Sequence, residues 1–366
     1  MNELENARKT INDIDAELAR LFEARMRACR DIAAYKKAAG LPVRDTVREK
    51  SLIEKNSELI GDPEIGAYYV PFIKNVIDLS CRFQTKLISG LRVSYSGVEG
   101  AFAYIAARRM FPEAELIACP DFAGAYRAVE DGEADCAVLP IENSYAGEVG
   151  VVMDLIFSGS LYVNRVIDVP VSHCLLGNPE ARLQSVKTAV SHPQALDQCA
   201  EYLRAKGLER ENYANTALAA QYVKESGRTD LAAIASAETA EIFGLKILDR
   251  DIHDNKTNTT RFGAFSRVRG QNPRRGKSDA ENFILMFTVR NEAGSLAQAL
   301  DIIGAHGFNM RSLRSRPMKA LQWSYYFYIE AEGNIQDENG RNMLRELSAM
   351  CDKLRLAGAY YDESQK

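Results

Sequence analysis

The sequence predicts a multidomain chain in which an all-α module, an α/β module and a small α+β module follow one another. Residues 1–88 carry apolar side chains at the three-then-four spacing of amphipathic helices and have almost no strand signals. Residues 91–268 alternate short apolar strands with helices, which favours an α/β domain with mostly parallel sheets. Among these elements we expect a strand over 162–177 and a helix over 194–207. Residues 282–366 follow the order β-α-β-β-α-β of a ferredoxin-like domain. Between the last two, residues 269–281 are rich in Gly, Pro and charge and predict a linker.

Composition narrows the class of protein. A chain of 366 residues has room for two or three domains, and its hydrophobic share of 46% is sufficient for packed cores. The formal net charge of −4 argues against a partner that is nucleic acid or a membrane surface. The chain contains no run of the roughly 18 apolar residues that a membrane helix requires. Its charged beginning lacks the apolar core of a signal peptide, so we expect a soluble protein.

The cysteines, histidines and glycines indicate neither a metal nor a cofactor. The seven Cys are scattered and none belongs to a C-x-x-C pair, so we expect reduced thiols in the cytoplasm. The four His are also scattered, and no H-E-x-x-H motif occurs. Gly97 and Gly100 form only part of a nucleotide-binding glycine loop, and a P-loop is absent. We therefore expect no metal, nicotinamide or ATP.

The helical module begins with an unusually long predicted helix, over residues 3–39. Gly40 is expected to end it and Pro42 to block its continuation. Two further helices are expected over 46–60 and 67–88. At about 1.5 Å per residue the first helix is about 55 Å long, and this module is too small to cover it from within one chain. The sequence therefore predicts a homodimer or higher homo-oligomer in which the long helices pack together.

Basic residues lie on or near the apolar face of this helix. Arg25 and Lys36 are 11 residues apart, which at about 100° per residue places them within about 20° of each other. Both can therefore reach one pocket, whereas Arg8 points about 100° away from Arg25 and could reach a partner's site. Ser80 and Gln84 are spaced for hydrogen bonding at one place. The alternative is a solvated helix face with extended Arg and Lys stems.

The order of these residues closely resembles the all-helical chorismate mutases. The order is Arg8, Arg25 and Lys36, then Pro-Val-Arg-Asp at 42–45, then Arg48–Glu49 and Ser80-x-x-x-Gln84. The resemblance implies that Arg8 reaches in from the other subunit, and that Lys36 and Gln84 stabilise the ether oxygen of chorismate. It further implies that other residues bind the carboxylates, the ring hydroxyl side and the rest of the substrate: Arg25, Arg48, Asp45, Glu49 and Ser80. The reaction is a concerted rearrangement that needs no nucleophile, so cations that hold a folded conformer suit it.

Four motifs stand out in the α/β module, over residues 95–103, 139–147, 191–199 and 257–262, and each of the last three has a structural alternative. Glu142–Asn143 follow a predicted strand, where α/β proteins build sites, but Asn also suits a turn. Ser191-His192-Pro-Gln ends another strand, but Ser and Pro also suit a helix start. Thr-Thr-Arg-Phe at 259–262 offers two hydroxyls and a guanidinium, but could be an edge strand with exposed Thr.

Together these motifs closely resemble prephenate dehydratase over residues 91–268. That family has two α/β lobes arranged like a periplasmic binding protein, with the site in the cleft between them. The resemblance implies that the hydroxyl of Thr260 is the main catalytic group. The remaining implied site residues orient prephenate or shape the site: Glu142, Asn143, Ser191, Gln198, Arg261 and Phe262. His173 and His192 are possible proton sources, although a buried structural His is the favoured interpretation of each.

Residues 282–362 resemble an ACT domain, an amino-acid-sensing fold. Gly294, Leu296 and Ala297 match a segment that borders the L-phenylalanine site in related dehydratases, and a helix start suits the carboxylate of an amino acid. Ser315-Arg316-Pro317 match a second motif, but Arg314 stands where that motif usually has Glu. The alternative is a structural ACT module that binds no effector.

The three resemblances together identify the chain as a member of the bifunctional chorismate mutase/prephenate dehydratase (P-protein) family. They imply substrates chorismate and prephenate, the product phenylpyruvate, and feedback inhibition by L-phenylalanine. Three alternatives remain open. These are a two-lobed protein that binds a ligand without turning it over, a mutase fused to prephenate dehydrogenase, and a mutase module that is only regulatory. The dehydrogenase would require a dinucleotide glycine loop, which the sequence lacks.

Overall fold

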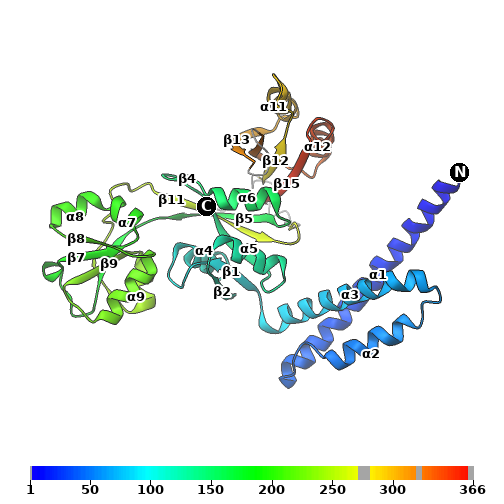
Figure 1. Cartoon of the computed structure of the whole chain (residues 1–366), viewed down its shortest axis with the longest axis horizontal. Coiled ribbons are helices and arrows are strands. Elements are labelled where there is room, and N and C mark those ends of the chain that lie inside the picture. Colours follow the sequence, from blue (N-terminus) through cyan, green and yellow to red (C-terminus); the bar gives the residue numbers. More distant parts are fainter. Residues whose placement is uncertain (1, 271–280, 319–323, 362–366) are drawn as a thin grey trace. The chain divides into compact units, whose positions relative to one another are not determined.

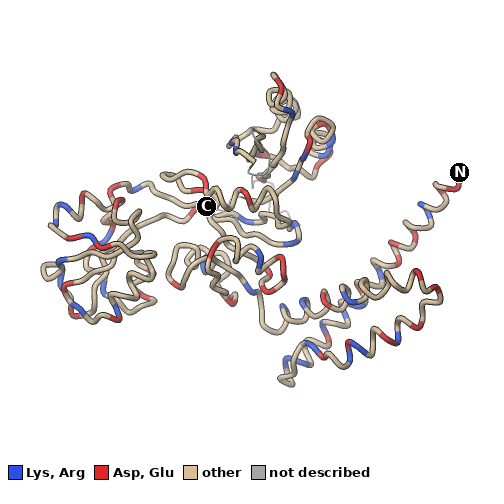
Figure 2. The backbone as a smooth tube through the Cα atoms, in the orientation of Figure 1, with Lys and Arg blue, Asp and Glu red and all other residues tan. Residues whose placement is uncertain are grey.

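The computed structural model describes residues 2–270, 281–318 and 324–361. The chain divides into two compact units, Met1–Arg92 and Val93–Lys366, and each is described by itself. Residues 271–280 of the predicted linker lie outside the described residues. Among the residues that are described, no helix is long and apolar enough to cross a bilayer. Figure 2 shows acidic and basic residues interspersed along the helices of the first unit.

The first unit consists of three helices, α1 (Glu3–Ala39), α2 (Thr46–Ser57) and α3 (Pro63–Ser89) (Figure 1). The predicted helix over 3–39 is confirmed at both ends. Asn2 and Glu5 form a capping box, and Gly40 ends the helix with φ 63°. The second helix ends three residues earlier than predicted. The third begins four residues earlier, because Asp62 caps it and the next residue is a proline at its first position.

The first unit has a small core, and much of α1 is left uncovered. The only buried residues of α1 are Cys29 and Ala33, both in its C-terminal half. The core proper comes from α3, where Ile73, Ile77 and Cys81 pack against apolar residues of α2 and α3 and against Val43. Large apolar side chains of α1 remain exposed by about half of their surface, namely Leu4, Ile11, Ile14, Leu18 and Leu21. This uncovered stripe carries the helical spacing seen in the sequence.

The second unit begins with a lobe built on one sheet. Its strands are β1 (Arg92–Ser96), β2 (Glu115–Cys119), β3 (Cys136–Asn143), β4 (Gly147–Glu148), β5 (Tyr162–Pro170) and β11 (Thr259–Ser266). Its helices are α4 (Phe102–Met110), α5 (Phe122–Glu130) and α6 (Gly150–Ser158). The main path of the sheet runs β5-β11-β3-β1-β2. β1 and β3 are parallel, but β11 is antiparallel to both of its neighbours, so the expected mostly parallel sheet is a mixed one.

A second lobe follows, with a five-stranded sheet in the order β10-β6-β9-β7-β8. Its strands are β6 (Cys174–Gly177), β7 (Thr188–Ser191), β8 (Glu209–Asn212), β9 (Leu231–Ala235) and β10 (Lys246–Asp249). Its helices are α7 (Pro193–Gln198), α8 (Ala200–Lys206), α9 (Thr216–Ser226) and α10 (Ala237–Phe243). The chain passes between the lobes twice, from β5 to β6 and from β10 back to β11. This is the two-lobed arrangement that the sequence predicts.

In this region, two elements that were predicted as continuous are each divided in the structure. The strand expected over 162–177 is two strands in different sheets, because β5 ends at Pro170, which cannot donate a ladder hydrogen bond. The helix expected over 194–207 breaks at Cys199, whose φ and ψ of −117° and 22° lie outside the helical region. Both breaks fall beside the interlobe cavity described below.

The last part of the second unit is the predicted β-α-β-β-α-β module. Its elements are β12 (Glu281–Thr288), α11 (Ser295–Ala305), β13 (Asn309–Pro317), β14 (Tyr325–Glu332), α12 (Glu338–Met350) and β15 (Lys353–Tyr361). The strand order β13-β14-β12-β15 is ferredoxin-like, which confirms the prediction. β15 also pairs with β5 through Gly358 and Val163, so one sheet continues across both modules. A Cβ at Gly358 would collide with the carbonyl oxygen of Val163, so the pairing requires glycine here.

Both faces of β12 are buried within the second unit. Phe283, Leu285 and Phe287 pack under α11 and α12. The alternating residues Ile284 and Met286 join the core that also contains α5 and α6 of the first lobe. Because alternate residues of a strand face opposite sides, β12 packs against helices on both of its faces. The C-terminal module therefore shares a continuous core with the first lobe.

Candidate active sites

The helical unit encloses a cavity of about 330 Å³ to which all three helices contribute. The lining residues come from the C-terminal half of α1, the α1–α2 connection, α2 and the C-terminal half of α3. They are Arg25, Ala28, Cys29, Ile32, Lys36, Val43, Asp45, Arg48, Glu49, Leu52, Ile77, Ser80, Cys81 and Gln84. Every residue that the sequence predicts for this site is in that set except Arg8. Arg8 lies in the exposed N-terminal half of α1.

Hydrogen bonds hold the cations of this cavity in place. The Arg25 Nε donates to Ser80 Oγ at 3.2 Å, and the Lys36 Nζ donates to the carbonyl oxygen of Val43 at 2.5 Å. Asp45 accepts from the backbone N–H of Arg48 at 3.0 Å and so caps α2. Gln84 is 6% exposed, and its Oε1 has no hydrogen-bond partner among the described residues. A buried amide oxygen without a hydrogen-bond partner lowers the stability of the fold, so this cavity suits a polar ligand.

Sequence reasoning missed one polar residue of the cavity, Cys81. Its Sγ lies 3.7 Å from Glu49 Oε1, and burial followed by the neighbouring Glu49 raises the pKa of the thiol. Cys81 precedes Gln84 by three residues, so helical spacing alone places it on the same face. Arg44, by contrast, pairs with Asp78 and Glu49 and does not line the cavity.

A second cavity, of about 480 Å³, lies between the two lobes of the α/β region. Its lining residues come from the loop after β3, from α7 and from the segment that leads into β11. They are Tyr145, His192, Pro193, Gln194, Asp197, Gln198, His253, Asp254, Asn255 and Asn258. Gln198 is the one predicted site residue among them. His253, Asp254 and Asn255 carried no sequence signal, whereas Asn258 belongs to the motif at 257–262 but was assigned no role there.

Asn143 and Thr260 stand together beside this cavity. The Asn143 Nδ2 donates to Thr260 Oγ1 at 2.9 Å and to Asn258 Oδ1 at 2.8 Å. Asn143 Oδ1 accepts the backbone N–H groups of Tyr145 and Ala146, so Asn143 also forms the turn that the structural alternative proposed. The edge-strand alternative for Thr260 is wrong, because β11 lies between β3 and β5. Since Thr260 Oγ1 accepts from Asn143, its own proton remains available for donation.

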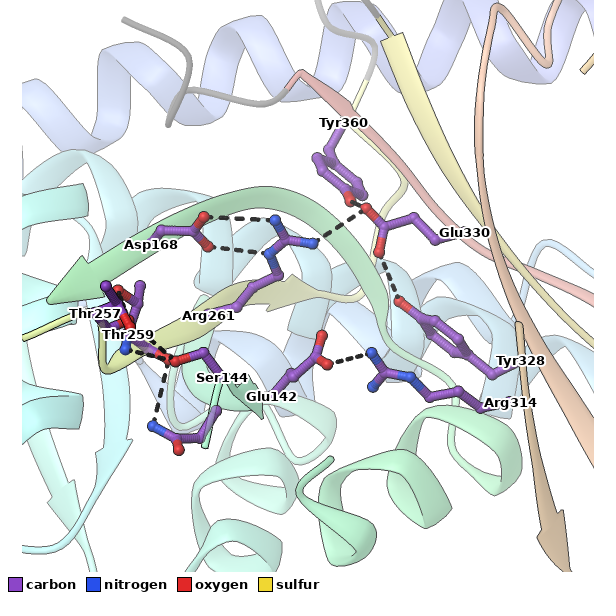
Figure 3. Close-up of polar contacts among 11 residues, drawn as sticks. Glu142, Ser144, Asp168, Thr257, Thr259, Arg261, Arg314, Tyr328, Glu330 and Tyr360 are labelled. Atoms are coloured by element: carbon purple, nitrogen blue, oxygen red, sulfur yellow. Dashed lines mark hydrogen bonds and ion pairs between the residues drawn. The ribbon is translucent and has the colours of Figure 1, made fainter. Parts of the chain in front are cut away.

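The neighbours of these two residues face the other way. In the β3–β11 register, Thr260 pairs with Asn143 and Arg261 pairs with Glu142, so the two pairs project from opposite faces of the sheet. Arg261 Nε donates to Asp168 Oδ1 at 3.0 Å, and its Nη1 reaches Glu330 Oε1 at 3.4 Å. Glu142 forms an ion pair with Arg314 (Figure 3). The next strand residue, Phe262, is 2% exposed and belongs to the core.

In the Ser-His-Pro-Gln motif, the serine is buried in the fold and the histidine lines the cavity. Ser191 is fully buried and donates to the carbonyl oxygen of Ile234 at 2.6 Å. The helix cap predicted here is formed by His192, whose Nδ1 accepts from the backbone N–H of Gln194 at 3.2 Å. His192 is only partly buried and lines the cavity. The motif therefore contributes a strand end, a helix cap and part of the cavity wall.

His173 is buried and orients Gln198. Its Nε2 lies 2.9 Å from Gln198 Oε1. Desolvation by burial lowers the pKa of His173 to about 4, although the contact with Gln198 works in the opposite direction. The imidazole is therefore neutral at pH 7, as the structural interpretation of this residue predicts. It fixes the amide that lines the cavity.

The C-terminal module has a cavity of its own, of about 300 Å³. It lies between the end of β12, the start of α11 and strand β14. Its lining residues are Thr288, Val289, Arg290, Asn291, Glu292, Leu296, Met318, Ser324, Tyr325, Phe327 and Asp352. Of the predicted regulatory residues, Leu296 lines it and Gly294 caps the adjoining helix α11 with φ 89°.

The other predicted regulatory residues lie outside that lining set. Ala297 is exposed on α11, and Ser315, Arg316 and Pro317 belong to β13. Arg316 Nη1 contacts Glu148 Oε1 at 2.5 Å, and its Nε contacts Asp154 at 3.4 Å. Arg316 therefore connects the C-terminal module to the first lobe.

Comparisons with known proteins agree with this two-site architecture. Residues 7–85 match the family model of chorismate mutase type II, and residues 93–269 match that of prephenate dehydratase. A bifunctional chorismate mutase/prephenate dehydratase of Enterobacter agglomerans is 31% identical over 99% of this chain and 97% of its own length.

Two solved structures resemble the chain beyond its helical unit. The prephenate dehydratase of Arthrobacter aurescens, solved with L-Phe, is 28% identical over 75% of this chain and 91% of its own, with a TM-score of 0.68. A protein described as a novel type of quorum-quenching acylase is 33% identical over 74% of this chain and 98% of its own, also with a TM-score of 0.68. The fold alone therefore does not define the reaction.

The mutase match over the helical unit and the dehydratase match over the two-lobed module define a bifunctional enzyme with a separate domain for each reaction. The matches over both domains and over the full length identify the family. The chain belongs to the bifunctional chorismate mutase/prephenate dehydratases. It is an enzyme of phenylalanine biosynthesis that rearranges chorismate to prephenate and then dehydrates and decarboxylates prephenate to phenylpyruvate.

Proposed function

We propose that the helical cavity is the mutase site and that the Asn143–Thr260 pair with the interlobe cavity is the dehydratase site. The observation that carries the first assignment is the convergence of Arg25, Lys36 and Arg48 in one cavity. A substrate with two carboxylates is the chemistry that such a set of cations recognises.

In the mutase site, Arg25 and Arg48 bind the carboxylates and hold the folded conformer of chorismate. Charge develops on the ether oxygen as its bond breaks, and Lys36 and Gln84 donate hydrogen bonds to it. Each such donor is worth about 3 kcal/mol in the transition state. The amide of Gln84 fits this role when its nitrogen faces the cavity. Asp45, Glu49 and Ser80 contact the remaining polar groups of the substrate.

The mutase site is completed by a second copy of the chain. Arg8 does not line the cavity of its own chain, and the exposed apolar residues of α1 provide a surface that a second α1 would cover. An antiparallel pairing of two such helices brings the N-terminal half of one to the C-terminal half of the other. We assign the partner's Arg8 to the substrate carboxylates and the homodimer to the active form.

Mixing two inactive variants tests this assignment. Arg8→Ala chains and Lys36→Ala chains are denatured together and refolded. If Arg8 acts across the dimer, each mixed dimer has one intact site, and mutase activity returns to about one quarter of wild type. If Arg8 acts within its own chain, both sites of a mixed dimer stay defective and no activity returns.

In the dehydratase site, Thr260 assists the departure of the ring hydroxyl. A Thr hydroxyl is a weak acid, so it donates a hydrogen bond to the leaving oxygen or passes a proton to it, while Asn143 holds its orientation. Loss of carbon dioxide and hydroxide makes the ring aromatic, which supplies the driving force. Gln198, fixed by neutral His173, orients prephenate across the cavity. Glu142 and Arg261 act from the opposite face of the sheet.

The C-terminal module is an ACT domain whose cavity binds L-phenylalanine. Leu296 supplies an apolar wall, and the start of α11 offers backbone N–H groups for a carboxylate. The structurally similar dehydratase from Arthrobacter aurescens was solved with the same amino acid. Leu296→Asp should abolish inhibition by millimolar L-phenylalanine and leave uninhibited turnover unchanged. Persisting inhibition in that variant would place the effector elsewhere.

The whole proposal is tested by feeding chorismate to the purified protein and following prephenate and phenylpyruvate with time. Transient prephenate followed by phenylpyruvate supports both sites. Prephenate without phenylpyruvate would contradict the dehydratase assignment. The seven cysteines, which all lie among the described residues and are all free, support a reducing compartment, and we assign the enzyme to the cytoplasm.

A further inference from the structure

In the dehydratase module, two pairs of residues that are adjacent in sequence have their side chains on opposite faces of the sheet. Asn143 and Thr260 meet each other beside the interlobe cavity, whereas Glu142 and Arg261 face the C-terminal module. Because neighbouring residues of a strand are joined by a stiff peptide unit, a force on one member of a pair moves the other. The catalytic hydroxyl is therefore mechanically linked to the far face of its sheet.

The first link is the ion pair between Glu142 of β3 and Arg314 of β13. The side chains are 31% and 20% exposed, so the pair is partly shielded from water and its attraction is stronger than that of a surface pair. The Arg314 guanidinium also lies 5.8 Å from the ring centre of Tyr328, which restricts its position. Arg314 is thus held by its own module while it holds the end of β3.

The second link is centred on Glu330 of β14, which is 3% exposed. Its carboxylate accepts from Tyr360 Oη at 2.5 Å and faces Tyr328 Oη at 3.4 Å (Figure 3). The cation that compensates this buried charge is Arg261 of β11, at 3.4 Å. Asp168 of the neighbouring strand β5 holds the same guanidinium. Breaking a buried pair leaves an uncompensated charge, so Glu330 fixes Arg261 and with it the start of β11.

We propose that Arg314 and Glu330 of the C-terminal module are positioning residues for dehydration. By holding Glu142 and Arg261 they set the distance between Asn143 and Thr260, and so the geometry of the hydroxyl that assists the leaving group. The inference rests on the proposed dehydratase site and adds to it two residues that no substrate touches. It also assigns Glu142 and Arg261 to this linkage and removes them from direct contact with prephenate.

The decisive variants are at Arg314, since this residue is partly exposed and its replacement leaves no buried charge alone. With prephenate as substrate, Arg314→Ala should lower dehydratase kcat about tenfold with little change in KM, because the substrate's own contacts remain. Arg314→Lys keeps the charge and should recover most of the rate. Arg314→Glu places like charges together and should lose more than Arg314→Ala.

A double-mutant cycle shows whether Arg314 acts through Glu142. Glu142→Ala should match Arg314→Ala, and the double variant should be no slower than either single variant. The matched control is Arg311→Ala. Arg311 belongs to the same strand and pairs with Glu332 at 3.5 Å within the C-terminal module, with similar exposure. That variant should stay within about twofold of wild type. Mutase activity, measured with chorismate, reports that each variant is folded.

Two results would overturn the inference. One is a dehydratase kcat for Arg314→Ala within twofold of wild type. The other is a loss of dehydratase activity in Glu142→Ala far larger than that in Arg314→Ala, since Glu142 would then act on the substrate itself. Failure of the underlying site assignment is distinct from both. It would appear as wild-type dehydratase turnover in Thr260→Ala, whatever the Arg314 variants do.

Discussion

The mutase cavity and the dehydratase cleft are built on opposite plans. In the helical unit, residues from three helices converge on one cavity, and nearly all predicted side chains point into it. In the two-lobed module, the predicted residues other than Gln198 lie on strands, and neighbours in sequence project to opposite faces. Only Gln198 of that set lines the interlobe cavity. A helix gathers residues three or four positions apart, whereas a strand separates residues that are adjacent.

The difference matches the two reactions. The rearrangement of chorismate needs a conformer to be held and charge to be stabilised, so a fixed ring of cations is sufficient. The dehydration of prephenate needs one hydroxyl to be aimed at a leaving group. In the structure, β11 carries the proposed hydroxyl, and β11 and its neighbour β3 each form an ion pair with the C-terminal module through Arg261 and Glu142. The comparison predicts that mutase chemistry is local, while dehydration depends on residues outside its cavity.

The largest expected effect is that of Lys36→Ala on the mutase. Removing the cation beside the breaking ether bond should lower mutase kcat at least about a thousandfold, since it removes a charged donor needed in the transition state. Conversion of prephenate to phenylpyruvate should be unchanged. The measurement is initial rate with each substrate, and near-wild-type mutase turnover would remove Lys36 from the mechanism.

The next effect is that of Thr260→Ala on dehydration, with a loss of about a hundredfold to a thousandfold in kcat. Thr260→Ser keeps the hydroxyl and serves as the matched control, which should retain a measurable rate. Mutase turnover should not change in either variant. The two rates are followed by the absorbance of phenylpyruvate and by the loss of chorismate. Equal activity of the Ala and Ser variants would show that the hydroxyl has no role.

The smallest expected effect is on the way the free energy of unfolding depends on pH. His173 has a folded-state pKa of about 4, below its ordinary value of 6.5, because it is buried. Between these values the unfolded chain binds a proton that the folded chain does not, so stability falls as the pH drops from 6.5 to 4. The loss is at most about 3 kcal/mol. His173→Gln should flatten this dependence, and urea unfolding at several pH values measures it. An unchanged slope would mean that His173 is not the group that titrates.

All four histidines lie in the second unit, so the helical unit has none. Unfolding of the helical unit should therefore lack this component. A probe specific to each unit separates the two transitions.

The sequence predicted the helical unit almost completely. Apolar spacing and the Gly40–Pro42 stop predicted α1 to the residue, and angular separation grouped Arg25 with Lys36. The same angular separation set Arg8 apart from these two residues. The uncovered apolar stripe of α1 is consistent with the predicted dimer, which the subunit-mixing experiment tests.

The two-lobed module was harder to predict, because its strand pairing is set by contacts distant in sequence. Nothing near Thr260 reveals that β11 returns between β3 and β5, or that its partner across the ladder is Asn143. The roles of Asn258 and Glu330 follow only from that return, since both act through residues more than sixty positions away. The resemblance placed the motifs in one module, but strand register decides which members of each motif share a face.

Prephenate accumulation shows whether one chain carries two separable sites. Thr260→Ala is incubated with chorismate, and prephenate is measured against chorismate consumed. We expect one prephenate for each chorismate at the wild-type mutase rate, with no phenylpyruvate beyond the slow residual turnover. Two separable sites are ruled out if folded Thr260→Ala protein consumes chorismate slowly or still produces phenylpyruvate at the wild-type rate.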